Sequence, residues 1–179
     1  MGQADDFDSF VRARTHALLR SAYLLTGDQH LAEDLVQTAL ARTHLAWRRL
    51  RATGNAEAYA RKIMYHHQVS WWRRRRVPES LTDTPPEGRR ADDSDIATVR
   101  LTLRAALQRL TPRQRAVLVP RYYEDHSEQE AAALLGVSVG TVKSQTAKAL
   151  GRLRQVAPEL AAFGSVEEAP DERPAQRPA

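Results

Sequence analysis

The sequence predicts an all-α protein composed of two small helical domains joined by a flexible linker, and three observations support this fold class. Apolar residues recur three and four positions apart along most of the chain, which is the pattern of amphipathic helices. Residues that typically cap helices precede several of these segments. A polar segment with three prolines separates the helical patterns into two groups, and no segment alternates as a half-buried strand does.

The N-terminal group contains three predicted helices, which we expect to pack as a compact bundle. The first, over residues 7–25, ends at Thr26-Gly27-Asp28, where the glycine stops one helix and the aspartate can cap the next. The second helix is expected over residues 29–50 and the third over residues 56–76.

The C-terminal group contains four predicted helices. Helical periodicity resumes over residues 96–110. Thr111 and Ser127 each open a capping box, because glutamine or glutamate stands three residues later, and Ser138 can cap the helix that follows it. These starts predict three helices in succession, of which the one after Ser127 is short and ends at Gly136.

The patterns divide the chain into four parts. We expect helical domains over residues 1–77 and 95–157, a flexible linker over 78–94 and a disordered C-terminal tail over 158–179. A fully extended linker reaches about 55 Å at ~3.4 Å per residue, so the two domains can occupy distant sites.

The composition excludes several function classes. The chain has no cysteine, so disulfides, thiolate catalysis and cysteine-ligated zinc are ruled out. Its start, MGQADDFDSF, lacks the features of a secretory signal and no apolar run is long enough for a membrane span, so we expect a cytoplasmic protein without membrane insertion. The six histidines form no i,i+4 pair and no nucleophile–base pair can be assembled. We therefore predict no enzyme activity, no metal, no cofactor and no small-molecule substrate.

The distribution of charge indicates a polyanionic partner that is contacted at two places. Residues 61–76 hold six basic side chains and residues 139–157 hold four, and neither segment contains an acid. Between them, residues 77–98 hold six acids and two arginines. Two basic segments with an acidic connector are typical of a protein that binds nucleic acid through two surfaces.

A helix-turn-helix pattern lies at the second basic segment. Ala132 is small where two helices cross closely, Gly136 permits the turn, and Val142 returns an apolar side chain to the core. The next helix presents short polar and cationic groups, which suit base edges and phosphates in the major groove. These groups belong to Thr141, Lys143, Ser144, Gln145 and Lys148. The alternative, an amphipathic helix with a solvated polar face, stays open on the pattern alone.

The stretch HQVSWWRRRR places two tryptophans beside four arginines at the end of the third helix. The helix before it mixes cationic, aromatic and amide side chains. Unstacked bases gain about 1–3 kcal/mol each on an aromatic face, so this mixture suits single-stranded nucleic acid. The alternative is that the tryptophans end a helical core. Because adjacent helix positions differ by ~100°, we assign Trp71 to packing and Trp72 to the surface.

Three segments together resemble domains 2 and 4 of bacterial RNA polymerase sigma factors. They are AYLLTGDQHLAEDLVQTALARTHLAW, AYARKIMYHHQVSWWRRRR and LTPRQRAVLVPRYYEDHSEQEAAALLGVSVGTVKSQTAKALGRLR. The resemblance covers residues 7–156 and points to the extracytoplasmic-function (ECF) class, in its sigma-E-like actinobacterial branch. It implies a protein that binds core RNA polymerase at the β′ clamp helices and the β flap, directs initiation at promoter DNA, and is held by an anti-sigma factor.

The resemblance also implies roles for individual residues. Core docking is assigned to the polar side of the AEDLVQ helix, at Asp34, Gln37, Thr38 and Arg42. Capture and melting of the minus-ten element are assigned to the following loop and helix, at Gly54, Asn55, Ala56, Tyr59, Lys62, Ile63 and His66. Arg73 and Arg74 are assigned to nearby backbone phosphate. The minus-thirty-five element is assigned to the recognition-helix residues named above.

Three positions depart from the family pattern. His66 stands where asparagine is common, and Tyr59 occupies a position near which tryptophan is usual, so the base preference at the minus-ten element is open. Pro120 lies inside a predicted helix, where it removes a backbone hydrogen bond, and we expect a bend near Ala116.

The rival interpretation is a self-sufficient regulator that uses the C-terminal helices as a DNA-binding module of the LuxR type. Such a protein usually dimerises on two half-sites and has no need of an aromatic and basic helix that melts DNA. The two interpretations differ in whether the chain acts on a promoter without core polymerase.

Overall fold

The computed structural model describes residues 3–74 and 95–159, with the side chains of residues 6–70 and 101–159. The linker expected over 78–94 lies outside these ranges, as does the tail expected over 158–179 except for its first two residues. Helices account for the regular structure of the described ranges, which contain no strand. None of the helices described is long and apolar enough to span a bilayer.

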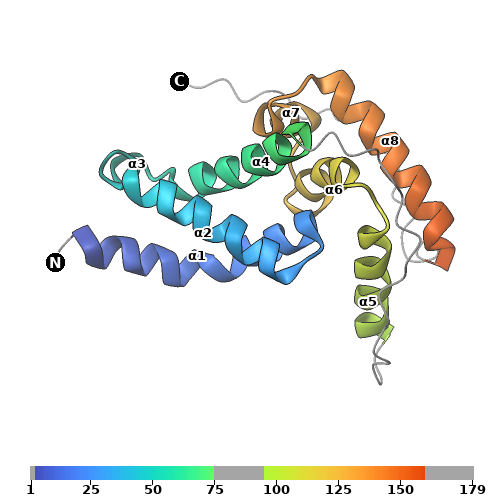
Figure 1. Ribbon diagram of the computed structural model, residues 1–179, viewed down its shortest axis with the longest axis horizontal. Coiled ribbons are helices and arrows are strands. Elements are labelled where there is room, and N and C mark those ends of the chain that lie inside the picture. The colour runs from blue at the N-terminus through green and yellow to red at the C-terminus, as the bar shows by residue number, and fades with distance from the viewer. Residues whose placement is uncertain (1–2, 75–94, 160–179) are drawn as a thin grey trace.

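Residues 3–74 of the N-terminal half form a bundle of four helices. Within it, α1 and α2 lie along each other beneath α3 and α4 (Figure 1). The helices are α1 (Gln3–Thr26), α2 (Gln29–Leu45), α3 (Trp47–Thr53) and α4 (Ala56–Arg74). Asp28 caps α2 as predicted, because its carboxylate accepts a hydrogen bond from the Leu31 N–H at 2.9 Å.

The prediction of one continuous helix over residues 29–50 is wrong. The helix stops at Leu45, and Ala46, with φ −95° and ψ 2°, redirects the chain into the short helix α3. This change of direction lets Trp47 pack against Phe7 and Phe10 of α1, with ring centroids 5.1 and 5.3 Å apart. No glycine or proline stands at this break between the two helices. The favourable free energy of burying the Trp47 ring explains it.

In the C-terminal half, residues 95–159 form four α-helices and one π-helical turn. They are α5 (Asp95–Gln108), α6 (Pro112–Leu118), the turn η1 (Val119–Tyr123), α7 (Glu128–Leu135) and α8 (Val139–Val156). The predicted caps are confirmed, since the side-chain oxygens of Thr111, Ser127 and Ser138 each accept a backbone N–H three residues later. Thr111 and Ser127 form complete capping boxes.

Pro120 is accommodated by the π-helical turn and not by the bend expected near Ala116. Helix α6 stays regular through Leu118, and the irregularity begins at Val119. In the wider turn the Glu124 N–H donates to the Val119 carbonyl at 3.1 Å, five residues back. The wider spacing relieves the clash that proline causes in an α-helix.

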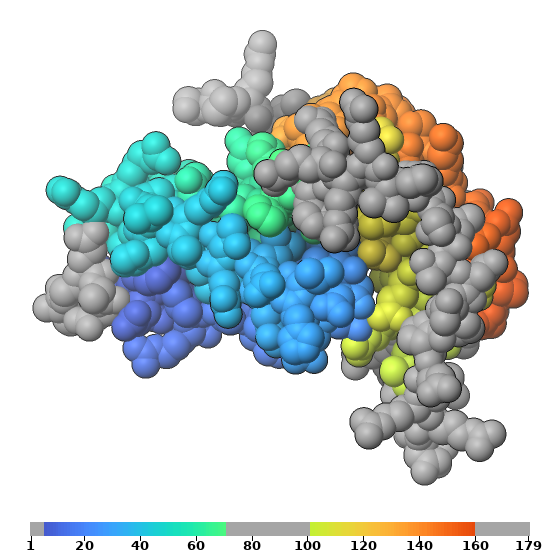
Figure 2. Space-filling view, in the orientation of Figure 1, coloured from blue at the N-terminus to red at the C-terminus, as the bar shows by residue number. Residues whose placement is uncertain are grey.

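The two halves share one hydrophobic core, which the sequence did not predict. Its buried members include Leu18, Leu35 and Met64 from the N-terminal half and Val117, Leu135 and Val142 from the C-terminal half. Helices α6 and α7 lie against α4, while α5 and α8 form the outer edge (Figure 1). In the space-filling view the lime and yellow surface of α5 lies beside the lighter blue surface where α1 ends and α2 begins (Figure 2).

Candidate nucleic-acid and polymerase interface

Helix α2 has one buried face and one polar face. Ala32, Leu35, Val36 and Ala39 are buried on the inner side. Of the residues expected to dock on polymerase, Asp34, Gln37 and Arg42 are exposed and Thr38 is half-buried. The polar face therefore needs no rearrangement of the bundle core to meet a protein partner.

The loop before α4 and the first turns of that helix carry the residues expected at the minus-ten element. Gly54 adopts φ 67°, in the left-handed region that glycine favours, and ends α3. Gly54, Asn55, Lys62 and His66 are exposed, whereas Tyr59 and Ile63 are half-buried. Ala56 is only 7% exposed against Trp47 and Leu50, so its side chain serves packing.

The basic end of α4 is described only in its backbone. The helix continues through Arg74, but the side chains of Arg73 and Arg74 lie outside the described residues. The same holds for Trp71 and Trp72, so the assignment of Trp71 to packing and of Trp72 to the surface remains a prediction.

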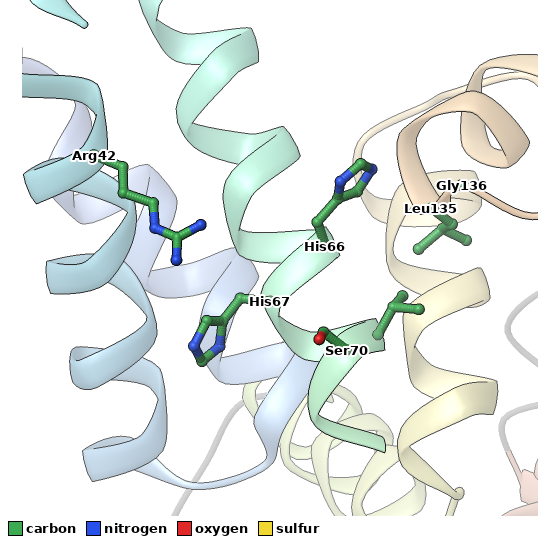
Figure 3. Close-up of a pocket in the computed structure, with 7 residues that line it drawn as sticks. Arg42, His66, His67, Ser70, Leu135 and Gly136 are labelled. Carbon is green, nitrogen blue, oxygen red and sulfur yellow. The ribbon is translucent and has the colours of Figure 1, made fainter. Parts of the chain in front are cut away.

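A cleft of about 510 Å³ lies where the two halves meet. One side is formed by Arg42 of α2 and by His66, His67 and Ser70 of α4; the other side is formed by Leu135 and Gly136 at the end of α7 (Figure 3). His67 points toward α2, whereas His66 points toward the turn at Gly136. A Cβ atom on Gly136 would lie 3.8 Å from Nε2 of His66. Residues assigned to core binding and to the minus-ten element thus border one cleft, which the C-terminal half partly encloses.

The helix-turn-helix geometry is confirmed. Ala132 and Val142 are buried, and Gly136 adopts φ 65° while its N–H donates to the Ala132 carbonyl. Helix α8 then buries Val142, Thr146 and Ala149. On its outer side, Lys143, Ser144 and Lys148 are exposed and Thr141 and Gln145 are half-buried.

Two local interactions organise the outer side of α8. The Lys143 ammonium lies 3.3 Å from the Glu128 carboxylate of α7, although 64% of the lysine side chain is exposed. The Ser138 and Thr141 hydroxyls lie 2.9 Å apart at the start of the helix. Glu128 therefore orients Lys143 without burying it.

The sequence analysis did not predict the polar groups that join the two halves. Glu124 reaches from the C-terminal half to Ser21 and Arg61, and Arg115 reaches the end of α1. Burial, reinforced by the nearby Glu124 carboxylate, raises the pKa of Tyr65 above its usual value, so its hydroxyl stays protonated. No local pattern marks these residues, because their partners are up to 103 positions away.

Comparison with known proteins gives concordant results. The family model described as sigma-70 region 2 matches residues 10–77, and the one described as sigma-70, region 4 matches residues 100–153. The chain is 43% identical over 155 residues to the RNA polymerase sigma-E factor of Streptomyces coelicolor, which covers 87% of this chain and 88% of that protein. It is 34% identical over 151 residues to the ECF RNA polymerase sigma factor SigL of Mycobacterium tuberculosis, which covers 80% of this chain and 84% of that protein.

A solved structure has a similar fold. It is the sigma factor RpoE of Bartonella quintana in complex with the anti-sigma factor NepR, with a TM-score of 0.57 and 26% identity. The match covers 84% of this chain and 96% of that chain. By its sequence relatives and by the two matched regions, the chain belongs to the ECF family of RNA polymerase sigma factors.

Proposed function

We propose that the chain binds core RNA polymerase and directs promoter-specific initiation, reading the minus-thirty-five element and melting the minus-ten element. The observation that carries the proposal is the helix-turn-helix, whose second helix α8 exposes Lys143, Ser144 and Lys148 on its open side while Val142, Thr146 and Ala149 are buried. A matched region 2 precedes it in the order that a sigma factor requires. A regulator with only the C-terminal module has no counterpart to that region.

In this proposal each of the two expected domains contacts a different part of the promoter, and the first domain also binds polymerase. Residues 1–77 dock on polymerase through Asp34, Gln37, Thr38 and Arg42, and open the minus-ten element through the loop at Gly54 and helix α4. Residues 95–157 read the minus-thirty-five element through Thr141, Lys143, Ser144, Gln145 and Lys148. The polymerase supplies the chemistry, so the chain itself is not a catalyst, and it acts in the cytoplasm where polymerase and DNA meet.

An anti-sigma protein is the second partner in this proposal. The related RpoE structure contains the anti-sigma factor NepR, and the shared fold extends over most of both chains. We infer that a protein of this functional class restrains the present chain as well.

Reconstituted transcription tests the proposal. DNA fragments selected from a random library by core polymerase plus the chain serve as templates, and transcripts are compared with and without each component. We expect specific start sites only when both are present. Asp34→Arg should reduce binding to core while leaving the helical content unchanged, because Asp34 is exposed. Start-site selection by core alone, or normal promoter recognition by the free chain, contradicts the proposal.

A further inference from the structure

Helix α3 carries three arginines that lie outside the two basic segments identified in the sequence. Residues 35–56 contain four arginines and no acidic residue. Three of the four, Arg48, Arg49 and Arg51, belong to α3, and all three are exposed. A surface of this composition attracts anions, because no neighbouring carboxylate in the segment offsets its charge.

The packing of α3 points two of these arginines away from the protein. Trp47 and Leu50 are each 6% exposed and form the inner side of the helix. Successive helix positions differ by ~100°, so Arg48 and Arg49 lie opposite this buried side. The change of direction at Ala46 therefore does two things, since it buries the tryptophan and presents the arginine pair, Arg48 and Arg49, to solvent.

The acidic side chains around α3 have other partners. The Asp6 carboxylate of α1 lies 3.5 Å from Nη1 of Arg51. Glu57, in the first turn of α4, is held by two arginines of α1 and α4, at 3.2 and 3.0 Å. Among the side chains that the structure describes, no acid pairs with Arg48 or Arg49. The arginine pair is therefore available to an anion from outside the chain.

The arginine pair lies next to the loop assigned to the minus-ten element. Helix α3 ends at Gly54, five residues after Arg49, which is about 7.5 Å along the helix axis at ~1.5 Å per residue. That length equals about two nucleotide steps of ~3.4 Å each. Helix α3 is at the end of the N-terminal half that is remote from α5 and α8 (Figure 1). The arginine pair thus extends the assigned minus-ten surface on its side away from the C-terminal half.

The chemistry of this surface suits phosphate better than bases or another protein. A guanidinium presents N–H donors in a planar fork that matches two phosphate oxygens. The other exposed residues of α3 are Arg51, Ala52 and Thr53, so the helix offers no aromatic face on which a base could stack. It also offers no large apolar side chain of the kind that anchors protein interfaces. Contacts to phosphate position a strand without reading its sequence.

We propose that Arg48 and Arg49 bind backbone phosphates of the single strand that is opened at the minus-ten element, about one to three nucleotides from the bases captured at the Gly54 loop. The inference rests on the proposed function and assigns to it a contact that is independent of base sequence. Because the arginine pair binds the opened strand, it shifts the equilibrium from duplex toward open DNA.

Binding of a single-stranded oligonucleotide to the holoenzyme tests the inference. The oligonucleotide carries the minus-ten element of a promoter selected in the reconstitution above, and fluorescence anisotropy is measured at several salt concentrations. We expect Arg48→Ala/Arg49→Ala to weaken binding at least about tenfold, since two charge-assisted contacts are lost. The slope of log affinity against log salt concentration should become shallower by about 1.4, at ~0.7 for each phosphate contact. Arg48→Lys/Arg49→Lys keeps both charges and should retain most of the slope.

Neutral linkages in the oligonucleotide locate the contact. A methylphosphonate replaces one phosphate at a time along the strand, and its effect on affinity is compared between the parent and Arg48→Ala/Arg49→Ala holoenzymes. We expect a loss of affinity at a few adjacent linkages in the parent and no loss at the same linkages in the variant. Equal losses at every linkage in both holoenzymes overturn the inference.

Arg20→Ala is the matched control. Arg20 is an exposed arginine of α1, about 15 Å along that helix, at ~1.5 Å per residue, from Phe10, which packs against Trp47. Its affinity and salt slope should equal those of the parent. Should thermal melts show that the double variant is unfolded, the single variants Arg48→Ala and Arg49→Ala decide, each with a slope shallower by about 0.7.

Two further results separate the alternatives. A salt slope equal to that of the parent in the folded variants overturns the inference. Weaker binding of Arg48→Ala/Arg49→Ala to core polymerase in the absence of DNA also overturns it, because the surface then contacts polymerase. Failure of the proposed function is distinguishable from both, since the parent holoenzyme then selects no promoter, whereas failure of this inference leaves promoter selection by the parent intact.

Discussion

At the scale of single residues, Lys143 combines an internal ion pair with an open position on the recognition helix. We expect Lys143→Ala to weaken minus-thirty-five binding by about 1–3 kcal/mol if the ammonium contacts a base. Folding stability should change by less than about 1 kcal/mol, because exposed ion pairs contribute little. Promoter titrations with holoenzyme and thermal melts of the free chain measure the two effects.

Arg154→Ala removes a similarly exposed charge from the last turn of α8 and serves as the control. It should leave minus-thirty-five preference unchanged. Equal promoter affinity in the parent and in a Lys143→Ala/Gln145→Ala double variant contradicts the assigned reading surface.

Arg115 shows why arginine and lysine differ at a buried site. Its planar fork reaches carbonyls at the ends of two helices, whereas a lysine ammonium cannot span both sets. We expect Arg115→Lys to lower the free energy of unfolding by about 3 kcal/mol, since buried carbonyls lose their donors. Arg113→Lys, on the exposed side of the same helix, should be nearly neutral. Equal midpoints for the two variants in urea unfolding speak against this account.

Residues with local partners were predictable from the sequence, and residues with distant partners were not. Thr111, Ser127 and Ser138 bond within three positions of themselves, so their types and spacing suffice to identify the caps. Glu124 and Arg61 are 63 positions apart, and only the assembled core brings them together. Among the expected site residues, the exposure of Asn55, Lys62 and Lys143 agrees with binding roles, which remain predictions.

At the scale of elements, the turn between α7 and α8 depends on one glycine. Gly136 has a positive φ, and a Cβ there finds ordinary contact distances, so backbone strain is the main cost of a side chain. We expect Gly136→Ala to destabilise the chain by about 1 kcal/mol. Gly151→Ala, in the interior of α8 with open space around it, should stabilise by about 0.5–1 kcal/mol. Thermal unfolding of both variants measures the opposite signs, and a shift in the same direction for both contradicts the argument.

Element boundaries differed from expectation where tertiary packing overrode local pattern. The break at Ala46 has no sequence signal, because the driving force is the burial of Trp47 against α1. The sequence predicted that Pro120 would disturb the helix, but it placed the disturbance near Ala116, whereas the π-helical turn begins at Val119. Pro120 sits within a wide turn that begins one residue before it, so the preceding helix keeps its regular geometry.

At the scale of the whole molecule, two modules that the sequence presents as separate are joined by a common core. Glu124 is buried where the halves join and pairs there with Arg61. Most of the groups assigned to polymerase or to the minus-thirty-five element nevertheless stay exposed, and the others are half-buried. The interface combines this apolar core with a few buried charged groups, of which Glu124 and Arg115 reach from the C-terminal half to the N-terminal half.

The shared core predicts that both halves unfold together. All three tryptophans, Trp47, Trp71 and Trp72, lie in the N-terminal half, so their fluorescence reports that half alone, while far-ultraviolet circular dichroism reports every helix. Leu135→Ala empties a buried position of α7 and should cost about 2–5 kcal/mol. Because Leu135 belongs to the common core, the fluorescence midpoint should fall together with the dichroism midpoint. A fluorescence midpoint that stays at the parent value while dichroism gains an earlier step means that the halves fold independently, and their contact then contributes nothing to stability.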